Sequence, residues 1–129
     1  MPRVHIIDDD EQVRETLRLL LEKAGYSVEE AADGNKAVEL YRQHQADLVI
    51  TDIHMPEKNG IEIIQEIQQI NPAVKVIVIS GGGELILKDE LYMTEALQSV
   101  KAEFEKPLDI QKLLQTVHEI LDESKERNY

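Results

Sequence analysis

Short apolar runs alternate with longer amphipathic segments along this chain, and the alternation restricts the fold more than any other feature of the sequence. Runs rich in β-branched residues are typical of strands buried on both faces of a parallel sheet. Such runs occupy residues 4–7, 47–51 and 74–79, and two further short segments, 27–31 and 102–105, are plausible strands. The carboxyl ends of parallel strands share one edge of the sheet, where ligands bind in open α/β folds. The polar residues that follow four of these segments are therefore expected at that edge: Asp8, Asp52, Ser80 and Lys106.

The segments between the runs carry apolar residues at helical spacing, most clearly in the segment that follows Asp109, a good N-cap residue. The apolar stripe of this last helix is expected to consist of Ile110, Leu113, Leu114, Val117, Ile120 and Leu121. Between Ser80 and Lys106 the pattern is weaker, because three glycines at 81–83 precede an imperfect helical pattern over residues 91–100. Each crossover between parallel strands is right-handed and covers one face of the sheet. We therefore predict an α/β fold, a (βα)5 doubly wound, five-stranded parallel sheet.

Composition and charge narrow the classes of function that this chain can have. Its 129 residues are enough for one domain, and the absence of cysteine excludes disulfides and thiolate zinc sites. The 26 acidic and 14 basic residues give a net charge of −12, which repels nucleic-acid phosphates and anionic lipid. We expect no direct nucleic-acid binding and no membrane association. The first apolar run stops at Asp8 and is too short for a signal peptide, so a cytoplasmic location is predicted.

Three consecutive aspartates, Asp8, Asp9 and Asp10, follow the first apolar run. Like charges at such spacing raise one another's pKa, and a bound cation would relieve the repulsion. Oxygen ligands with no neighbouring cysteine or histidine favour a hard ion such as Mg²⁺. The same aspartates equally fit the N-terminus of the next helix, where a carboxylate caps free N–H groups and favours the helix dipole. The acidic run alone leaves both interpretations open.

Asp52 favours the metal interpretation, because it ends the run that pairs beside the first one. There it would supply a third oxygen for a metal ion and a potential nucleophile toward phosphorus. Lys106 would place a cation opposite the metal, where it could hold a transferring phosphoryl group, and Ser80 would add a hydroxyl donor. Taken singly, Ser80 and Lys106 would be ordinary surface residues. Their joint placement indicates phosphoryl chemistry.

Four pieces of the chain carry a specific resemblance to the receiver domains of two-component response regulators. They are HIIDDDEQVRETL from His5, ADLVITDIHMPEKNG from Ala46, VIVISGGG from Val76 and FEKPLD from Phe104. The chain resembles this family from Arg3 to about Leu121. The resemblance implies a flavodoxin-like sheet with strand order 2-1-3-4-5. We expect a stand-alone, chemotaxis-regulator-like receiver domain over residues 1–122, a polar tail over residues 123–129 and no output domain.

The resemblance also implies roles for individual residues. Asp52 corresponds to the phosphoacceptor, and Mg²⁺ would be bound by Asp8, Asp9, Asp52 and the backbone carbonyl of His54. Ser80 and Lys106 correspond to the residues that contact the phosphoryl group. In this family the peptide bond before the proline that follows the lysine is usually cis, which makes the bond between Lys106 and Pro107 a candidate.

Partners and reactions follow from the same resemblance. The phosphoryl group would come from a phosphohistidine of a sensor histidine kinase or phosphotransfer protein, and phosphorylation would switch contacts with a downstream protein target. The protein would not be an enzyme beyond its own phosphorylation from a phosphodonor and its own dephosphorylation.

Two departures from the family pattern affect switching. Family members usually carry an aromatic residue three positions before the lysine, where this chain has Glu103, with Phe104 one position later. A bulge in this short strand could shift the register. The interval from Ser80 to Lys106 is also longer than usual, with the excess near residues 81–88. We expect the response to phosphorylation to run through Ser80 and this loop rather than through a buried ring.

Other residues have simpler interpretations. His54 and Gly82 occupy the positions that tune the lifetime of the phosphorylated state in the family. The remaining histidines are expected at the surface of a strand or helix rather than as phosphoryl carriers: His5, His44 and His118.

Three other functions fit parts of the sequence. A haloacid-dehalogenase-like phosphohydrolase also uses an aspartyl nucleophile but needs a second acid two residues later, where His54 stands. A nucleotide or flavin module would need glycines rather than aspartates after the first strand. A degenerate receiver would act as a binding module independent of phosphorylation, an alternative that the full set of acids, serine and lysine disfavours.

Overall fold

Five parallel strands form the centre of the protein. In the computed structural model, residues 1–55, 59–81 and 98–126 are described, the last four of them as backbone only. The strands are β1 (Arg3–Ile7), β2 (Ser27–Ala31), β3 (Leu48–Asp52), β4 (Val76–Ser80) and β5 (Val100–Glu105). They pair in the order β2-β1-β3-β4-β5, all parallel. The predicted flavodoxin-like α/β sheet with order 2-1-3-4-5 is thereby confirmed.

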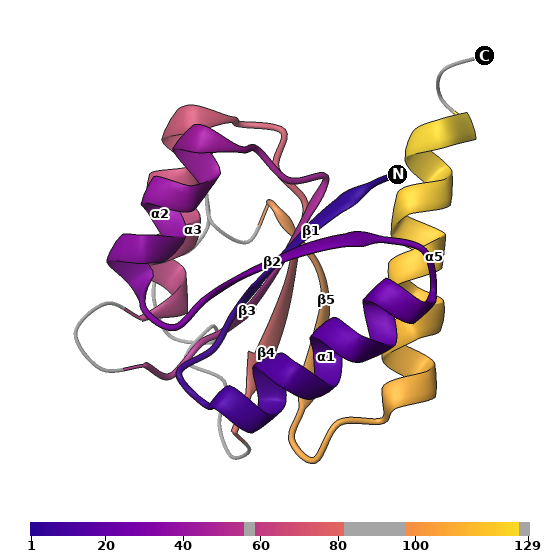
Figure 1. Cartoon of the computed structure of the whole chain (residues 1–129). Coiled ribbons are helices and arrows are strands. Elements are labelled where there is room, and N and C mark those ends of the chain that lie inside the picture. The colour runs from indigo at the N-terminus through magenta and orange to yellow at the C-terminus, as the bar shows by residue number, and fades with distance from the viewer. Residues whose placement is uncertain (56–58, 82–97, 127–129) are drawn as a thin grey trace.

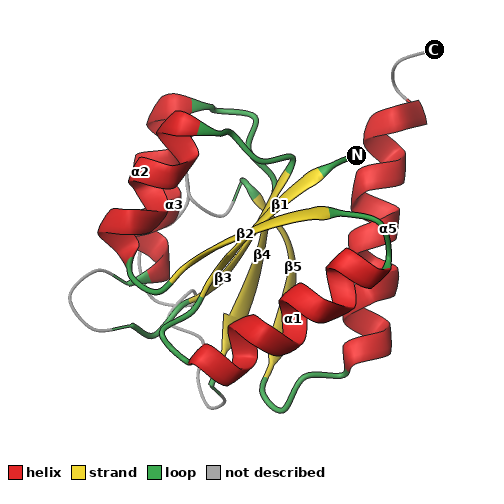
Figure 2. Cartoon of the chain, in the orientation of Figure 1, coloured by secondary structure: helices red, strands yellow, loops and turns green. Residues whose placement is uncertain are grey.

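Helices cover both faces of the sheet. The described helices are α1 (Glu11–Lys23), α2 (Gly34–Gln43), α3 (Gly60–Ile70) and α5 (Ile110–Glu126). In Figure 1, α1 and α5 lie on one side of the sheet and α2 and α3 on the other. The loops that follow β1 and β5 at their carboxyl ends lie along one edge (Figure 2). No helix in the described part is both long and apolar enough to cross a membrane.

Each face of the sheet has its own hydrophobic core, because successive residues of a strand point to opposite faces. On the α1 and α5 side, Ile6, Ile50 and Ile79 pack with Leu17 and Val117. On the other side, the core combines residues of α2 and α3 with the alternate positions of the same strands: Ile7, Val38, Val49, Ile61, Ile64 and Val78. Burial of each such side chain stabilises the fold by about 1.5–3 kcal/mol. Both cores lie behind the carboxyl edge and hold the strand ends in place.

Polar residues cap each described helix at its start. Asp10 accepts a hydrogen bond from Gln12 N at 2.9 Å and caps α1, and Asp33 caps α2 in the same way. Asn59 and Glu62 form a capping box at α3. The predicted cap of α5 is confirmed, since Lys112 N donates to Asp109 Oδ1 at 3.1 Å. Of the predicted apolar stripe of α5, four residues are buried and two are partly exposed: Leu113, Val117, Ile120 and Leu121, then Ile110 and Leu114.

Several local features differ from the sequence-based expectations. β5 starts at Val100, earlier than expected, and contains the bulge that the sequence left open: Val100 pairs with Val76, but Ala102 pairs with Ile77, so Lys101 is extra. α5 continues to Glu126, into the segment expected as a polar tail, because nothing there breaks a helix. The loop at 82–88, Gly82 included, and most of the helical pattern at 91–100 lie outside the described residues.

His5 corrects one prediction, because its side chain is 1% exposed rather than at the surface. β1 is an inner strand of a sheet that helices cover on both faces, so side chains on either face of β1 are buried. The His5 ring packs edge-on against Tyr41 of α2 and lies 3.5 Å from the Glu29 carboxylate on β2. His44 is exposed and His118 is half-buried, in keeping with the prediction for these two.

Candidate functional site

Four polar side chains gather where β1, β3, β4 and β5 end, as the strand pattern predicted. Asp8 directly follows β1, Asp52 ends β3 and Ser80 ends β4. All three are almost completely buried, with exposed fractions of 1%, 4% and 1%. Lys106 directly follows β5 and is partly exposed. Buried polar groups are costly without partners, so this edge is a built polar site and not a solvated surface.

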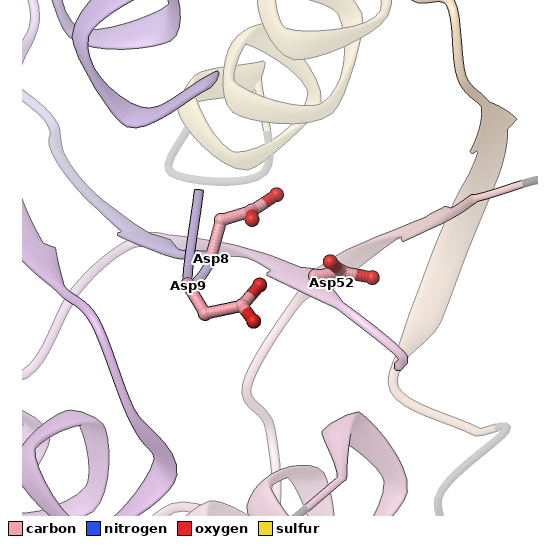
Figure 3. Close-up of side chains that lie close together, drawn as sticks. All are labelled: Asp8, Asp9 and Asp52. Carbon is pink, nitrogen blue, oxygen red and sulfur yellow. The ribbon is translucent and has the colours of Figure 1, made fainter. Parts of the chain in front are cut away.

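Three carboxylates in this site lie close enough to hold one cation. One oxygen each from Asp8, Asp9 and Asp52 lies within 4.8 Å of the others. Figure 3 shows the three side chains at the ends of β1 and β3. Asp9 is exposed, which leaves the cluster open to solvent on one side. Oxygen ligands with open positions for water suit Mg²⁺, so the residues fit the ion that the sequence predicted.

The acidic run combines the two roles that the sequence left open. Asp10 caps α1 through its side chain, while its N–H donates to Asp8 Oδ1 at 2.8 Å. Asp8 and Asp9 instead face Asp52. One aspartate of the run therefore ends the loop as a helix cap, and the other two contribute to the carboxylate cluster.

The backbone after β3 orients the Asp52 carboxylate. His54 N donates to Asp52 Oδ1 at 3.1 Å, which leaves Oδ2 directed to Lys106. Thr51 Oγ1 donates to the Asp52 carbonyl at 3.0 Å and fixes the main chain of the same residue. His54 thus lies beside the cluster through its N–H, and its carbonyl as a metal ligand stays a prediction.

Lys106 links the two buried aspartates. Its Nζ lies 3.2 Å from Asp8 Oδ2 and 3.3 Å from Asp52 Oδ2. Lys106 N donates to the Ser80 carbonyl at 2.8 Å, which continues the pairing of β4 and β5 to the site. The peptide bond between Lys106 and Pro107 is cis, as predicted. Ser80 Oγ is buried and has no hydrogen-bond partner among the described residues, so its hydroxyl is free for a ligand.

Comparison with known proteins identifies the family. Residues 4–118 match the family model of the response regulator receiver domain. The chain belongs to this family. Receiver domains are phosphoacceptor proteins of two-component signalling rather than classical enzymes, and in general they interact with kinases and downstream effectors.

Relatives and solved structures agree with this assignment. The protein CcdB of Bacillus subtilis is 36% identical over 123 residues, which cover 94% of this chain and 98% of the relative. The chemotaxis protein CheY of Thermotoga maritima is 47% identical over 83 residues, 64% of this chain and 69% of the relative. The crystal structure of the response regulator TrrA from Thermotoga maritima, in complex with Mg²⁺-BeF, has 26% identity and a TM-score of 0.79. That comparison covers 93% of this chain and 99% of TrrA.

Two pKa values in the receiver site are shifted upward, one mainly by burial and one by neighbouring charges. Burial raises the pKa of Asp8, and the Asp52 charge adds to the shift, although the Asp10 N–H and Lys106 oppose it. Burial lowers the pKa of Lys106, but the charges of Asp8 and Asp52 more than offset this and raise it above its ordinary value. Lys106 is therefore firmly protonated, and it neutralises part of a cluster that holds too many negative charges.

β5 places Glu103 at the surface and the neighbouring aromatic residue, Phe104, against the core. Glu103 pairs with Val78 and is exposed, whereas Phe104 pairs with Ile79. Phe104 packs against the core on the α1 and α5 side. The bulge at Lys101 precedes both residues, so Glu103 remains three positions before Lys106 and points away from the core that Phe104 contacts.

Gly60 is a residue of the site that sequence reasoning missed. A Cβ atom at this position would lie 2.5 Å from the Asp52 carbonyl oxygen and 2.8 Å from Ile53 Cα. The start of α3 therefore packs directly on the main chain that carries the phosphoacceptor candidate. The Asn59-Gly60 pair after a loop is a recognisable signal for a turn, but it does not reveal which backbone lies against it.

Proposed function

We propose that this receiver takes a phosphoryl group onto Asp52 from a phosphohistidine of a sensor histidine kinase or phosphotransfer protein. Mg²⁺ would be held by Asp8, Asp9, Asp52 and the His54 carbonyl. The single observation that carries this proposal is the position of Lys106 Nζ, within 3.3 Å of both buried carboxylates and at the rim of the three-carboxylate cluster. This arrangement places positive charge on the side of Asp52 where an incoming phosphoryl group would add negative charge.

The transfer is a displacement at phosphorus. An Asp52 carboxylate oxygen forms the new P–O bond, the P–N bond to the donor histidine breaks, and the histidine nitrogen keeps the electron pair. Bound Mg²⁺ would supply charge neutralisation for the phosphoryl oxygens. Lys106 exchanges its contact with Asp52 for one with the phosphoryl group, and the Ser80 hydroxyl donates a hydrogen bond to the same group. These exchanges would change contacts with a downstream protein target.

The reaction is confined to the protein's own side chain. We infer self-phosphorylation from a phosphodonor and self-dephosphorylation by water, with no separate substrate turned over. The relative called sporulation initiation phosphotransferase F of Bacillus subtilis, 31% identical over 119 residues, supports a place among proteins that pass phosphoryl groups on.

Intact-mass measurement after incubation with Mg²⁺ and acetyl phosphate tests the proposal. We expect the mass of one phosphoryl group on the wild-type protein, an adduct that base removes and that forms only when Mg²⁺ is present. Asp52→Asn keeps the shape of the side chain but lacks the nucleophilic carboxylate, so it should stay unmodified. The same base-labile adduct at the same rate in this variant would refute Asp52 as the acceptor.

A further inference from the structure

Arg14 of α1 connects the acidic loop to the edge strand β2. Its Nη1 donates to the Asp8 carbonyl oxygen at 2.8 Å, and its Nε donates to Glu30 Oε1 at 3.1 Å. The side chain is only 15% exposed, so these contacts are largely shielded from water. One planar guanidinium thus joins the main chain of the acidic loop to a carboxylate on another element.

Glu30 is itself held in place from two sides. Arg14 contacts its Oε1, and Arg18 Nη1 contacts its Oε2 at 2.9 Å. Arg14 and Arg18 are four residues apart and lie on the same face of α1. The carboxylate therefore contacts one guanidinium group through each of its oxygens, so the contact with Arg14 does not share an atom with the contact with Arg18.

The contact to Asp8 restrains the peptide unit that joins two of the proposed metal ligands. The Asp8 carbonyl belongs to the peptide bond between Asp8 and Asp9. The Asp8 N–H donates to the Ala31 carbonyl at the end of β2, at 3.2 Å. The main chain of Asp8 is thus tied to β2 twice, directly through its N–H and indirectly from its carbonyl through Arg14 and Glu30.

We propose that Arg14 is a positioning residue of the metal site, acting through the Asp8 main chain with Glu30 as its support. The inference rests on the proposed function and deepens it. Three carboxylates within 4.8 Å repel one another before an ion binds, and a free loop would relax by moving them apart. By fixing the peptide between Asp8 and Asp9, Arg14 keeps both side chains directed at Asp52.

The direction in which Mg²⁺ affinity changes when Arg14 is replaced distinguishes a positioning role from a purely electrostatic one. Removal of a cation near the cluster makes the local potential more negative, which on charge alone would strengthen Mg²⁺ binding. Loss of a contact that positions the metal ligands would instead weaken Mg²⁺ binding. Arg14→Lys sharpens the comparison, because it keeps the charge but has no planar fork to reach Asp8 and Glu30 together.

Titration calorimetry with Mg²⁺ on the full chain tests the proposal. We expect Arg14→Gln and Arg14→Lys each to weaken Mg²⁺ binding about 10-fold, the low end of the effect of outer contacts on metal sites. The matched control is Arg18→Gln, which loses the same charge from the same helix and the same Glu30 partner but has no contact with Asp8. Its affinity should stay within about 2-fold of wild type.

Hydrogen exchange supplies a second measurement that needs neither metal nor activity. The Asp10 N–H donates to Asp8 Oδ1 at 2.8 Å, so its exchange in metal-free protein reports on the loop. This N–H should exchange faster in both Arg14 variants than in Arg18→Gln. Urea unfolding of each variant checks that the difference does not come from a lower global stability. If Arg14→Gln does not fold, Arg14→Lys carries the test.

The outcomes distinguish this inference from the proposed function. Equal or tighter Mg²⁺ binding by both Arg14 variants, with wild type binding Mg²⁺ and accepting the phosphoryl group, would overturn the role of Arg14 alone. Wild-type protein that binds no Mg²⁺ and accepts no phosphoryl group would overturn the proposed function and this inference with it.

Discussion

At the scale of single residues, Lys106 is the group that balances the negative charge of the two buried aspartates when no metal ion is bound. Asp8 and Asp52 are buried side by side, and Lys106 Nζ lies within ion-pair distance of both. A buried charge without its partner is strongly destabilising, whereas a bound cation can take the place of a lost one. The lysine and a divalent ion therefore share one electrostatic task, the neutralisation of clustered carboxylates.

Lys106→Met should lower the free energy of unfolding by about 1–3 kcal/mol in the absence of divalent ions, because two buried carboxylates lose their counter-charge. The loss should be clearly smaller at saturating Mg²⁺. Urea unfolding with chelator and with Mg²⁺ measures both values. Lys112→Met, at an exposed position on α5, serves as the control and should show little change in either condition. An equal loss for Lys106→Met in both conditions would contradict this account.

At the scale of elements, the close approach of α3 to β3 depends on Gly60. The N–H of Gly60 donates to the Ile53 carbonyl at 3.0 Å, so the start of the helix is bonded to the chain just after β3. No side chain fits between these backbones. The position of α3 and the position of Asp52 are therefore coupled by direct backbone contact.

Gly60→Ala should destabilise the protein by about 1–3 kcal/mol, since the added methyl group must push α3 away from β3. Gly81→Ala is the matched control, because a Cβ at Gly81 would meet no atom of the described residues within 4 Å. Chemical unfolding of the two variants side by side gives the comparison. Equal stability of both would show that α3 moves away at no cost and that the coupling is weak.

The elements themselves were predictable because their signals are local. Strand composition, the helix cap at Asp109 and the glycine at position 25, with φ of 99°, all act on neighbouring residues. The alignment of polar residues at strand ends then predicted the site at Asp8, Asp52, Ser80 and Lys106. The bulge at Lys101 and the contact of Gly60 with Asp52 depend on packing between distant segments, which no local pattern records.

Arg14 and His5 escaped prediction for the same reason. In the sequence Arg14 is an ordinary charged residue of an amphipathic helix, and only the fold shows that its guanidinium group contacts Glu30 and the Asp8 carbonyl. In the sequence His5 is one polar residue of a strand, and only the fold shows that α2 places Tyr41 against its ring.

At the scale of the whole molecule, the buried His5 makes global stability depend on pH. Its Nε2 is buried without a hydrogen-bond partner among the described residues, although Glu29 lies 3.5 Å away. Burial lowers the pKa of His5, and the weaker opposite effect of Glu29 does not reverse this, while Arg3 and His44 lower it further. In the unfolded chain the pKa returns to about 6.5. The unfolded chain therefore binds a proton at this residue more readily than the folded protein does.

The free energy of unfolding therefore contains a contribution from neutral His5 that is fully present above about pH 6.5. This contribution is lost as the pH falls toward the lowered pKa of the folded protein, and the unfolding free energy then changes by at most about 1.4 kcal/mol per pH unit. We expect the unfolding free energy of His5→Phe, from urea titrations between about pH 7.5 and 5.5, to fall less steeply than that of wild type over this range. The phenyl ring fills a similar volume beside Tyr41 and carries no proton. Parallel curves for wild type and His5→Phe would show that protonation of His5 costs nothing in the folded protein, and that the charge on Glu29 compensates fully for burial.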